Sequence, residues 1–247
     1  MPIAYSFSIS TLVFKMYDYS KLTIIIPTLN EAKNIKILIG KLLQMYKGVH
    51  IIVTDDGSKD ATREEVLSFS GANDVSFLDR SKEKVHGLTA SVLAAVEAVK
   101  TRDIIVMDAD LQHPPEKVAL LAEALESCNL AIGVRQEVKD WGIYRKIVSK
   151  SVSTFCNTVF ALRGKKTSSD IMSGFFAIRS ELFKSIIAKH KDSYIGTGYK
   201  VLLETLKFIN SNEKVVEVPY TGFHERVYGK SKAGVKQLKD IIKATLR

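Results

Sequence analysis

Three polar residues near the middle of the chain have the composition of a divalent-metal site. Asp108, Asp110 and Gln112 follow an apolar run and precede two prolines. If residues 103–110 stay extended, Asp108 and Asp110 point to the same side, because residues two apart in a strand share a face, and Gln112 can join them. Such hard oxygen ligands suit Mg²⁺ or Mn²⁺, which can bridge diphosphate oxygens. A capping turn is the alternative, but the flanking apolar residues and prolines favour a metal site.

A second acidic segment, Asp55–Ser58, follows another apolar run. A carboxylate at the end of a strand can accept hydrogen bonds from the base or ribose of a nucleotide. The alternative is an ordinary helix N-cap at Ser58 or Asp60, and for this segment alone the cap would be preferred. Because both acidic segments stand at strand ends, we favour a nucleotide diphosphate as their shared ligand.

The elements that position these residues alternate between strands and helices. Short β-branched runs predict strands at 22–27, 49–53, 75–78 and 103–107. Helices are expected at 30–45, from Ser58 to about 69, and at 89–99. This alternation is typical of an α/β fold with a mostly parallel sheet covered by helices on both faces. Ligands of such sheets bind beyond the carboxyl ends of the strands, where both acidic segments fall.

The second half of the chain departs from this alternation. Residues 130–134 and 215–218 again predict strands, and long basic and apolar segments lie between them. We find no internal repeat, linker or low-complexity stretch. Residues 21–247 are therefore expected to form a single domain, and residues 1–20 an N-terminal extension of uncertain role.

Charge and composition narrow the class of partner. The 247 residues carry a net charge of +9, which favours an anionic partner such as nucleic acid, a phosphorylated substrate or a membrane surface. Cys128 and Cys156 are too few for a disulfide framework, which favours a reducing, cytoplasmic environment. No apolar run reaches the roughly 20 residues that a membrane-spanning helix needs, and the N-terminus is a poor signal peptide.

Much of the positive charge lies in one segment. Lys139 to Lys166 carries seven Lys or Arg and one Asp, with aromatic and aliphatic residues at spacings of three and four between them. A basic amphipathic helix of this kind fits a membrane interface. Nucleic acid and a solvated basic face over a normal core are the alternatives. Because we see no nucleic-acid recognition motif, nucleic acid is not expected as a partner.

Three ordered motifs carry a family resemblance: Ile26–Glu31, Asp55–Asp60 and Met107–Pro114. Together they resemble the inverting, GT-A-fold glycosyltransferases of family 2. With Ser173–Phe175 and the late pattern Arg226–Lys232, the set is most similar to dolichol-phosphate mannose synthases and related polyprenyl-phosphate glycosyltransferases. The resemblance runs from about Lys21 to Lys232 and implies a GT-A, Rossmann-like sheet with amphipathic interface helices in the second half.

The resemblance implies roles for the donor-binding residues. In that family the first two motifs hold the nucleotide, and the third holds metal and diphosphate. The residues carried over for nucleotide and donor binding are Pro27, Thr28, Glu31, Asp56, Lys84 and Asp108, with Asp108, Asp110 and Gln112 on the metal. The family's basic glycine loop reads Lys84-Val-His-Gly-Leu-Thr89 here, so that a threonine replaces its second glycine.

The acceptor side also follows from the resemblance. In the mannose synthases, arginines beyond the metal motif bind the lipid phosphate, and the matching positions are Arg135, Arg145 with Ser149, and Arg226. Arginine can grip a phosphate bidentately. Asp110 and Arg226 are the expected catalytic residues, one at the leaving group and one at the acceptor.

The expected function is transfer of a sugar, mannose from GDP-mannose, onto a dolichyl or polyprenyl phosphate at the cytoplasmic face of a membrane. Asp170 would be the candidate base for a glycan hydroxyl acceptor, the main alternative, although we favour a structural role for it. A non-catalytic nucleotide-sugar-binding protein is the second alternative. The chain ends at Arg247, which leaves a peripheral protein, a truncated one, or one partnered with a separate membrane subunit.

Overall fold

The computed structural model describes residues 17–71, 74–136, 143–198, 200–223 and 235–247. In this part of the chain seven strands form one sheet in the order β3-β2-β1-β4-β6-β5-β7. The strands are β1 (Leu22–Thr28), β2 (His50–Asp55), β3 (Val75–Asp79), β4 (Asp103–Val106), β5 (Leu130–Arg135), β6 (Phe176–Arg179) and β7 (Val215–Tyr220). β6 runs antiparallel to β4 and β5, whereas the other neighbouring strands are parallel.

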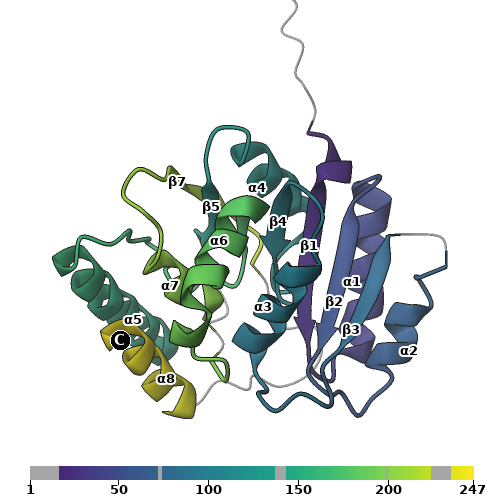
Figure 1. Ribbon diagram of the computed structural model, residues 1–247, viewed down its shortest axis with the longest axis horizontal. Helices are drawn as coiled ribbons and strands as arrows, with labels where there is room; N and C mark the ends of the chain where they lie inside the picture. Colours follow the sequence, from purple (N-terminus) through teal and green to yellow (C-terminus); the bar gives the residue numbers. More distant parts are fainter. Residues whose placement is uncertain (1–16, 72–73, 137–142, 199, 224–234) are drawn as a thin grey trace, which may run out of the picture.

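Helices cover both faces of the sheet (Figure 1). The helices are α1 (Ala32–Met45), α2 (Thr62–Leu67), α3 (Leu88–Ala98), α4 (Val118–Ala124), α5 (Ile143–Leu162), α6 (Ser180–His190), α7 (Val201–Leu206) and α8 (Val235–Leu246), with short 3-10 turns at Tyr19–Lys21, Pro115–Lys117 and Lys191–Ser193. Side chains alternate along the strands, so Ile25 packs with α3, α6 and α7, while Ile24 and Ile26 pack with α1, α2 and α4. The layered α/β fold expected from the sequence is confirmed.

Two details differ from the expectation. β4 ends at Val106, and residues 109–110 lie in a turn. The assumption that the chain stays extended to Asp110 is therefore wrong. β6 was not expected, because Phe176–Arg179 lies in the second half of the chain, where the alternation of strands and helices breaks down. Tyr17, which was counted in the N-terminal extension, is buried and packs in the same core cluster as α1. The boundary between the extension and the domain at residue 21 stays a prediction.

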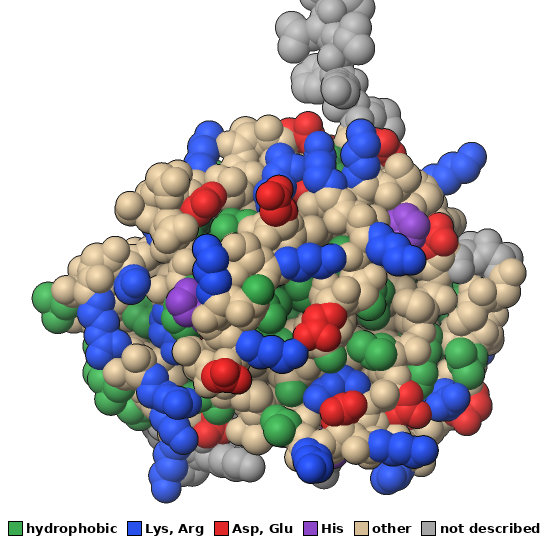
Figure 2. All heavy atoms as spheres, in the orientation of Figure 1, with side chains coloured by type: hydrophobic (Ala, Val, Ile, Leu, Met, Phe, Trp, Pro, Cys, Tyr) green, Lys and Arg blue, Asp and Glu red, His purple; other side chains and the backbone are tan. Residues whose placement is uncertain are grey.

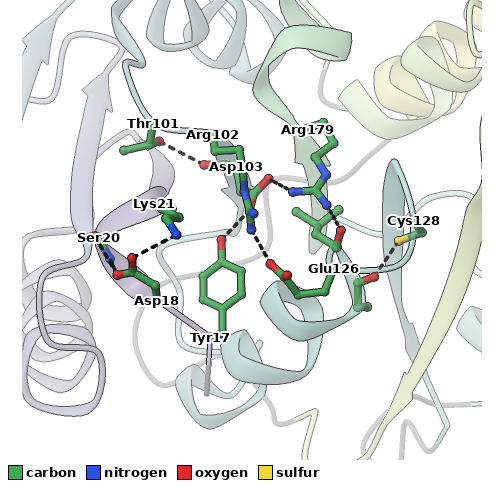
Figure 3. A network of polar contacts seen from close by, with 12 residues as sticks. Tyr17, Asp18, Ser20, Lys21, Thr101, Arg102, Asp103, Glu126, Cys128 and Arg179 are labelled. Atoms are coloured by element: carbon green, nitrogen blue, oxygen red, sulfur yellow. Dashed lines mark hydrogen bonds and ion pairs between the residues drawn. The ribbon is translucent and has the colours of Figure 1, made fainter. Parts of the chain in front are cut away.

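A buried polar network holds the edge of the sheet where β4 begins (Figure 3). Asp103 accepts hydrogen bonds from Tyr17 Oη at 2.5 Å, from Arg102 Nε at 3.0 Å and from Arg179 Nη1 at 2.8 Å. Arg102 also pairs with Glu126. The Asp103 carboxylate is buried but has donors on both oxygens, as a buried charge requires. Tyr17, β4 and β6 are thereby tied together.

The amphipathic helix expected in the basic segment is α5. Cys156 and Phe160 are buried on one of its faces, whereas Ile147, Phe155 and Leu162 are exposed. Helix α8 lies beside it, and the guanidinium of Arg163 donates to the carbonyls of Thr245 and Leu246. Figure 2 shows hydrophobic and basic side chains mixed along this end of the molecule. No helix among the described residues is long and apolar enough to cross a membrane.

Candidate active site

The predicted site residues that end or follow β1, β2, β4 and β5 lie at the carboxyl edge of the parallel strands. The register pairs Thr28 of β1 with Asp55 of β2, and Ile25 of β1 with Val106 of β4. On the other side of β6, Arg135 at the end of β5 pairs with Tyr220 of β7. Because parallel strands end together, the residues that follow β1, β2, β4 and β5 reach one edge, as the sequence predicted.

Two turns, residues 28–32 and 55–62, are hydrogen-bonded into one unit that we call the donor turns. Asn30, in a left-handed conformation at φ 56°, donates its backbone N–H to Ser58 Oγ at 2.7 Å and accepts from the N–H of Lys59 at 2.7 Å. Thr28 Oγ1 donates to Asp55 Oδ2 at 3.0 Å. These contacts explain why the first two motifs occur together. Pro27 and Thr28 are buried, while Glu31 stands before α1 with its carboxylate bound by Asn34.

Asp56 is held by donors from its own chain. Arg80 Nη1 lies 2.7 Å and His86 Nδ1 3.1 Å from its Oδ1, and the N–H of Gly87 donates to Oδ2 at 2.6 Å. Arg80 is itself buried and also donates to Ser91 Oγ and the carbonyl of Val85. Asp56 thus joins the donor turns to the basic glycine loop. Its nucleotide contact stays a prediction.

The replacement of a glycine by Thr89 has a structural counterpart. Thr89 is buried, and its N–H donates to the carbonyl of Gly198, while the N–H of Ala90 donates to that of Gly196. A Cβ on Gly87 would lie 2.6 Å from the carbonyl oxygen of Gly196, so the two loops are in close contact. The start of α3 is therefore packed against residues 195–198. Lys84 is exposed on the same loop.

The metal motif forms a turn. Asp110 is buried, and its Oδ1 accepts from the backbone N–H of Gln112 at 3.1 Å across Leu111, whose φ is 61°. The Asp108 side chain keeps 35% of its surface exposed. Gly174, before β6, lies so close that a Cβ there would be 2.7 Å from Asp108 Oδ2. Because the strand has already ended, the joint orientation of Asp108 and Asp110 toward a metal stays a prediction.

His113 links this turn to the far edge of the sheet. Its Nδ1 lies 2.7 Å from Tyr220 Oη of β7, and its Nε2 lies 3.7 Å from Asp108 Oδ2. The rings of Phe175, Tyr220 and Phe223 surround it. Burial raises the pKa of Tyr220, so its hydroxyl is a neutral partner for the imidazole. The histidine therefore braces the Asp108 side of the site.

Arg135 forms a bidentate ion pair with Asp170. Its Nε lies 2.7 Å from Asp170 Oδ2 and its Nη2 2.7 Å from Oδ1. Burial would lower the pKa of this guanidinium, but the hydrogen bonds and charge of Asp170 raise it. The guanidinium also lies 4.9 Å from the centre of the Phe223 ring. Asp170 thus orients Arg135, in agreement with the structural role favoured for it.

The remaining acceptor residues are placed less completely. Ser149 lies in α5, partly exposed. Arg145 is in the first part of the same helix, but its side chain is outside the described part. Arg226 also lies outside the described residues. The described geometry therefore brings together Arg135 and the metal motif, and the other three assignments stay predictions.

Sequence reasoning missed three residues of the site, Arg80, Tyr220 and His113. Arg80, which holds Asp56, follows the third strand, and this position at a strand end was the available signal. Tyr220, the partner of His113, is the last residue of β7, and it carries no local signal. His113 stands within the third motif, but the sequence gives it no role of its own.

Residues 23–187 match the family described as Glycosyl transferase family 2. The chain belongs to this family. Relatives named as mannosyltransferases are similar to most of the chain. A dolichol-phosphate mannosyltransferase of Pyrococcus furiosus is 35% identical over 92% of this chain, which spans 63% of that protein's length. One of Saccharomyces cerevisiae is 33% identical over 87% of this chain and 81% of its own length. The resemblance expected from the motifs is confirmed.

Solved structures show the same fold. Glucosyl-3-phosphoglycerate synthase of Mycobacterium tuberculosis, in complex with Mn²⁺, uridine diphosphate and phosphoglyceric acid, superposes with a TM-score of 0.66. The match covers 93% of this chain and 80% of that one, at 18% sequence identity. At 18% identity, this structural similarity shows that the present chain has the GT-A fold, and it shows nothing about its substrates.

Proposed function

We propose that this glycosyltransferase moves a hexose, mannose from GDP-mannose, onto a dolichyl or polyprenyl phosphate. The observation that carries the proposal is the placement of the metal motif and Arg135 on either side of the loop before β6. Asp170 pairs with Arg135, and Gly174 of the same loop abuts Asp108. The relatives named dolichol-phosphate mannosyltransferase, similar over most of this chain, support the lipid-phosphate acceptor and the mannose donor.

On the donor side, the nucleotide would lie over the donor turns. Thr28, Glu31 and Asp56 are the proposed contacts, with Pro27 shaping the turn and exposed Lys84 reaching toward the phosphates. Asp56 already has donors from its own chain, but a carboxylate has about four lone-pair directions and can accept further hydrogen bonds.

The side chains after β4 fit a divalent metal. Among the described residues no group of three or more His, Cys, Asp or Glu is arranged to hold an ion by itself. Mg²⁺ is commonly bound by one or two carboxylates together with substrate phosphates and water, which matches Asp108, Asp110 and Gln112 beside a diphosphate. When bound, Mg²⁺ or Mn²⁺ would neutralise the charge that develops on the leaving diphosphate. The complex of the mycobacterial synthase with Mn²⁺ supports a divalent metal as cofactor.

On the acceptor side, a phosphate needs positioning more than deprotonation. A phosphate monoester is largely ionised near neutral pH, with a second pKa of about 6. Arg135, Arg145, Ser149 and Arg226 are the proposed contacts, and attack from the face opposite the diphosphate would invert the anomeric centre. A hydroxyl acceptor would need a base. Asp170, the candidate base, is instead engaged in an ion pair with Arg135, which disfavours a hydroxyl acceptor.

The exposed apolar side chains of α5 and α8 support a peripheral position on a membrane. Ile147 is 58% and Leu162 83% exposed on α5, among basic residues that anionic lipid would attract. We place the protein on the cytoplasmic face, alone or with a separate membrane subunit.

A transfer assay tests the proposal. The purified chain is incubated in detergent with polyprenyl phosphate, with Mn²⁺ or Mg²⁺, and with one radiolabelled nucleotide sugar at a time. The panel of donors includes GDP-mannose and UDP-glucose. We expect label in the lipid phase, greatest with GDP-mannose, dependent on metal, and absent when polyprenol without phosphate replaces the acceptor. D108N serves as the matched inactive protein.

The same assay separates the alternatives. Label in a soluble glycan but not in lipid would favour a hydroxyl acceptor. Tight binding of nucleotide sugars with no transfer from any donor, by well-folded protein in lipid, would overturn the enzymatic proposal in favour of a binding protein.

A further inference from the structure

Lys200 stands directly against the loop that joins the two sides of the site. It precedes α7, and its Nζ donates to the carbonyl of Met172 at 2.7 Å. Met172 leads into Gly174, which abuts the Asp108 carboxylate, and follows Asp170, which holds Arg135. The ammonium is therefore held by the loop whose residues contact both Asp108 and Arg135, although no motif points to it.

The charges around Lys200 form an alternating set. The ammonium interacts electrostatically with the carboxylates of Asp108 and Asp170 and with the guanidinium of Arg135. Burial lowers the pKa of Lys200 to about 8; Arg135 also lowers it, while the two carboxylates act in the opposite direction. Burial therefore disfavours the charged form more than these carboxylates favour it. An additional anion at this point would offset that cost.

We propose that Lys200 is a substrate-binding residue whose ammonium contacts a phosphoryl oxygen, either of the donor diphosphate or of the acceptor phosphate. The inference rests on the proposed function, because both substrates of that reaction bring phosphate to this edge of the sheet. A compact ammonium binds phosphate as a point charge, which complements the planar fork of Arg135. Its hydrogen bond to Met172 keeps the ammonium in place before the ligand arrives.

Lys207, just after the other end of α7, is a useful comparison because its contacts are with structural groups. It is buried, and its Nζ donates to the carbonyl of Ala244 in α8 at 3.0 Å. Burial lowers its pKa as well, but its electrostatic partner is Glu204 rather than Asp108 or Asp170. Both lysines donate to a backbone carbonyl, but Lys207 is buried whereas Lys200 is half-buried. Of the two, Lys200 has Asp108, Asp170 and Arg135 as electrostatic partners.

The test compares K200Q with K207Q. Glutamine keeps an N–H donor but removes the charge. Calorimetry measures the Kd of GDP and UDP with Mn²⁺, and the transfer assay gives the KM for polyprenyl phosphate. We expect K200Q to weaken one of these constants about 10- to 100-fold, the range that a hydrogen bond to a charged group contributes. A raised nucleotide Kd assigns the donor diphosphate, and a raised KM assigns the acceptor phosphate. K200R should restore most of the loss.

A measurement on the unaltered protein covers the case in which K200Q does not fold. Amine-reactive labelling of Lys200, followed by mass spectrometry, should slow when GDP with Mn²⁺ or inorganic phosphate is added, whereas labelling of Lys207 should not change. The proposal is overturned if Lys200 is protected by neither, or if K200Q and K207Q change both constants equally. Absence of transfer by the wild type would instead count against the proposed function, because the binding and labelling measurements need no turnover.

Discussion

The two ends of β4 each carry a carboxylate, and the two have opposite surroundings. Asp103 begins the strand with its side chain 0% exposed, and Tyr17, Arg102 and Arg179 donate to it (Figure 3). Asp108, just beyond the other end, keeps 35% of its side chain exposed and has His113 at 3.7 Å. Asp103 is enclosed by groups of its own chain, whereas Asp108 is partly open to solvent at the edge of the sheet where we propose that the ligands bind.

This difference separates a carboxylate that holds the fold from one that is available to a ligand. Asp103 and Asp108 are both acidic residues that flank the same apolar strand, so the sequence around them does not tell them apart. What distinguishes them is burial: both oxygens of Asp103 accept hydrogen bonds from residues distant in the chain, Tyr17 and Arg179, whereas the Asp108 side chain remains 35% exposed. Substitutions at the two ends should therefore affect different properties.

The largest effect is expected from D103N, on stability. The change leaves Arg102 and Arg179 without their buried counter-ion, and breaking a buried pair costs about 3–5 kcal/mol. Urea unfolding should show this loss, while donor binding by the protein that remains folded should be unchanged. A stable D103N with impaired catalysis would reverse the contrast between the two ends.

D108N should have the complementary effect, on activity. Removing one group that stabilises the leaving-group charge lowers kcat about 10²–10³-fold, by analogy with losses measured at other charge-stabilising sites. The unfolding midpoint should hardly move, because this side chain is partly exposed. Equal destabilisation by D108N and D103N would contradict the comparison, and so would full activity of D108N.

D170N tests whether the acceptor side depends on orientation or on a base. The amide loses the charge and one of the two hydrogen bonds to Arg135, and kcat/KM should fall about 10- to 100-fold, the range for a hydrogen bond to a charged group. Measurable turnover should remain. Complete loss of transfer, with normal folding and donor binding, would instead identify Asp170 as a base for a hydroxyl acceptor.

Y17F should have the smallest effect. It removes the hydrogen bond to Asp103 and should cost about 1.5 kcal/mol of unfolding free energy. Burial, together with Asp103, raises the pKa of Tyr17, so its stabilising contribution is complete below the ordinary tyrosine pKa of about 10 and is lost as the pH rises above it. The difference between wild type and Y17F should shrink above pH 10. A constant difference would exclude this tyrosine as the titrating group.

Local patterns predicted much of the fold and the residue types of the site. The β-branched run before Thr28 and the apolar run before Asp108 mark β1 and β4 because buried parallel strands need such residues. β6 is as short as β4, but it escaped prediction because it lies in the second half of the chain, where the alternation of strands and helices breaks down. Its pairing with β4 and β5 depends on contacts distant in the sequence.

Pairings within the site were also beyond sequence reasoning. Arg135 and Asp170 were both named, but nothing local shows that they meet across β5 and the loop before β6. Arg80 and Lys200 carry no motif, and their importance comes from the groups placed around them by the sheet. The expected extension of the strand to Asp110 failed for a local reason: the Asp110 carboxylate accepts a hydrogen bond from the N–H of Gln112 and stabilises a turn there.

The reversed direction of β6 bears on how this scaffold can be altered. Since β6 enters the sheet at the edge where β4 and β5 end, the residues just before it reach the site: Gly174 lies against Asp108, and Asp170 pairs with Arg135. This segment links α5 to β6 and is separate from the donor turns, which are held by hydrogen bonds to each other. Under the proposed function, replacing residues 168–174 with those of a relative would change the surroundings of Arg135 and leave the donor turns unaltered.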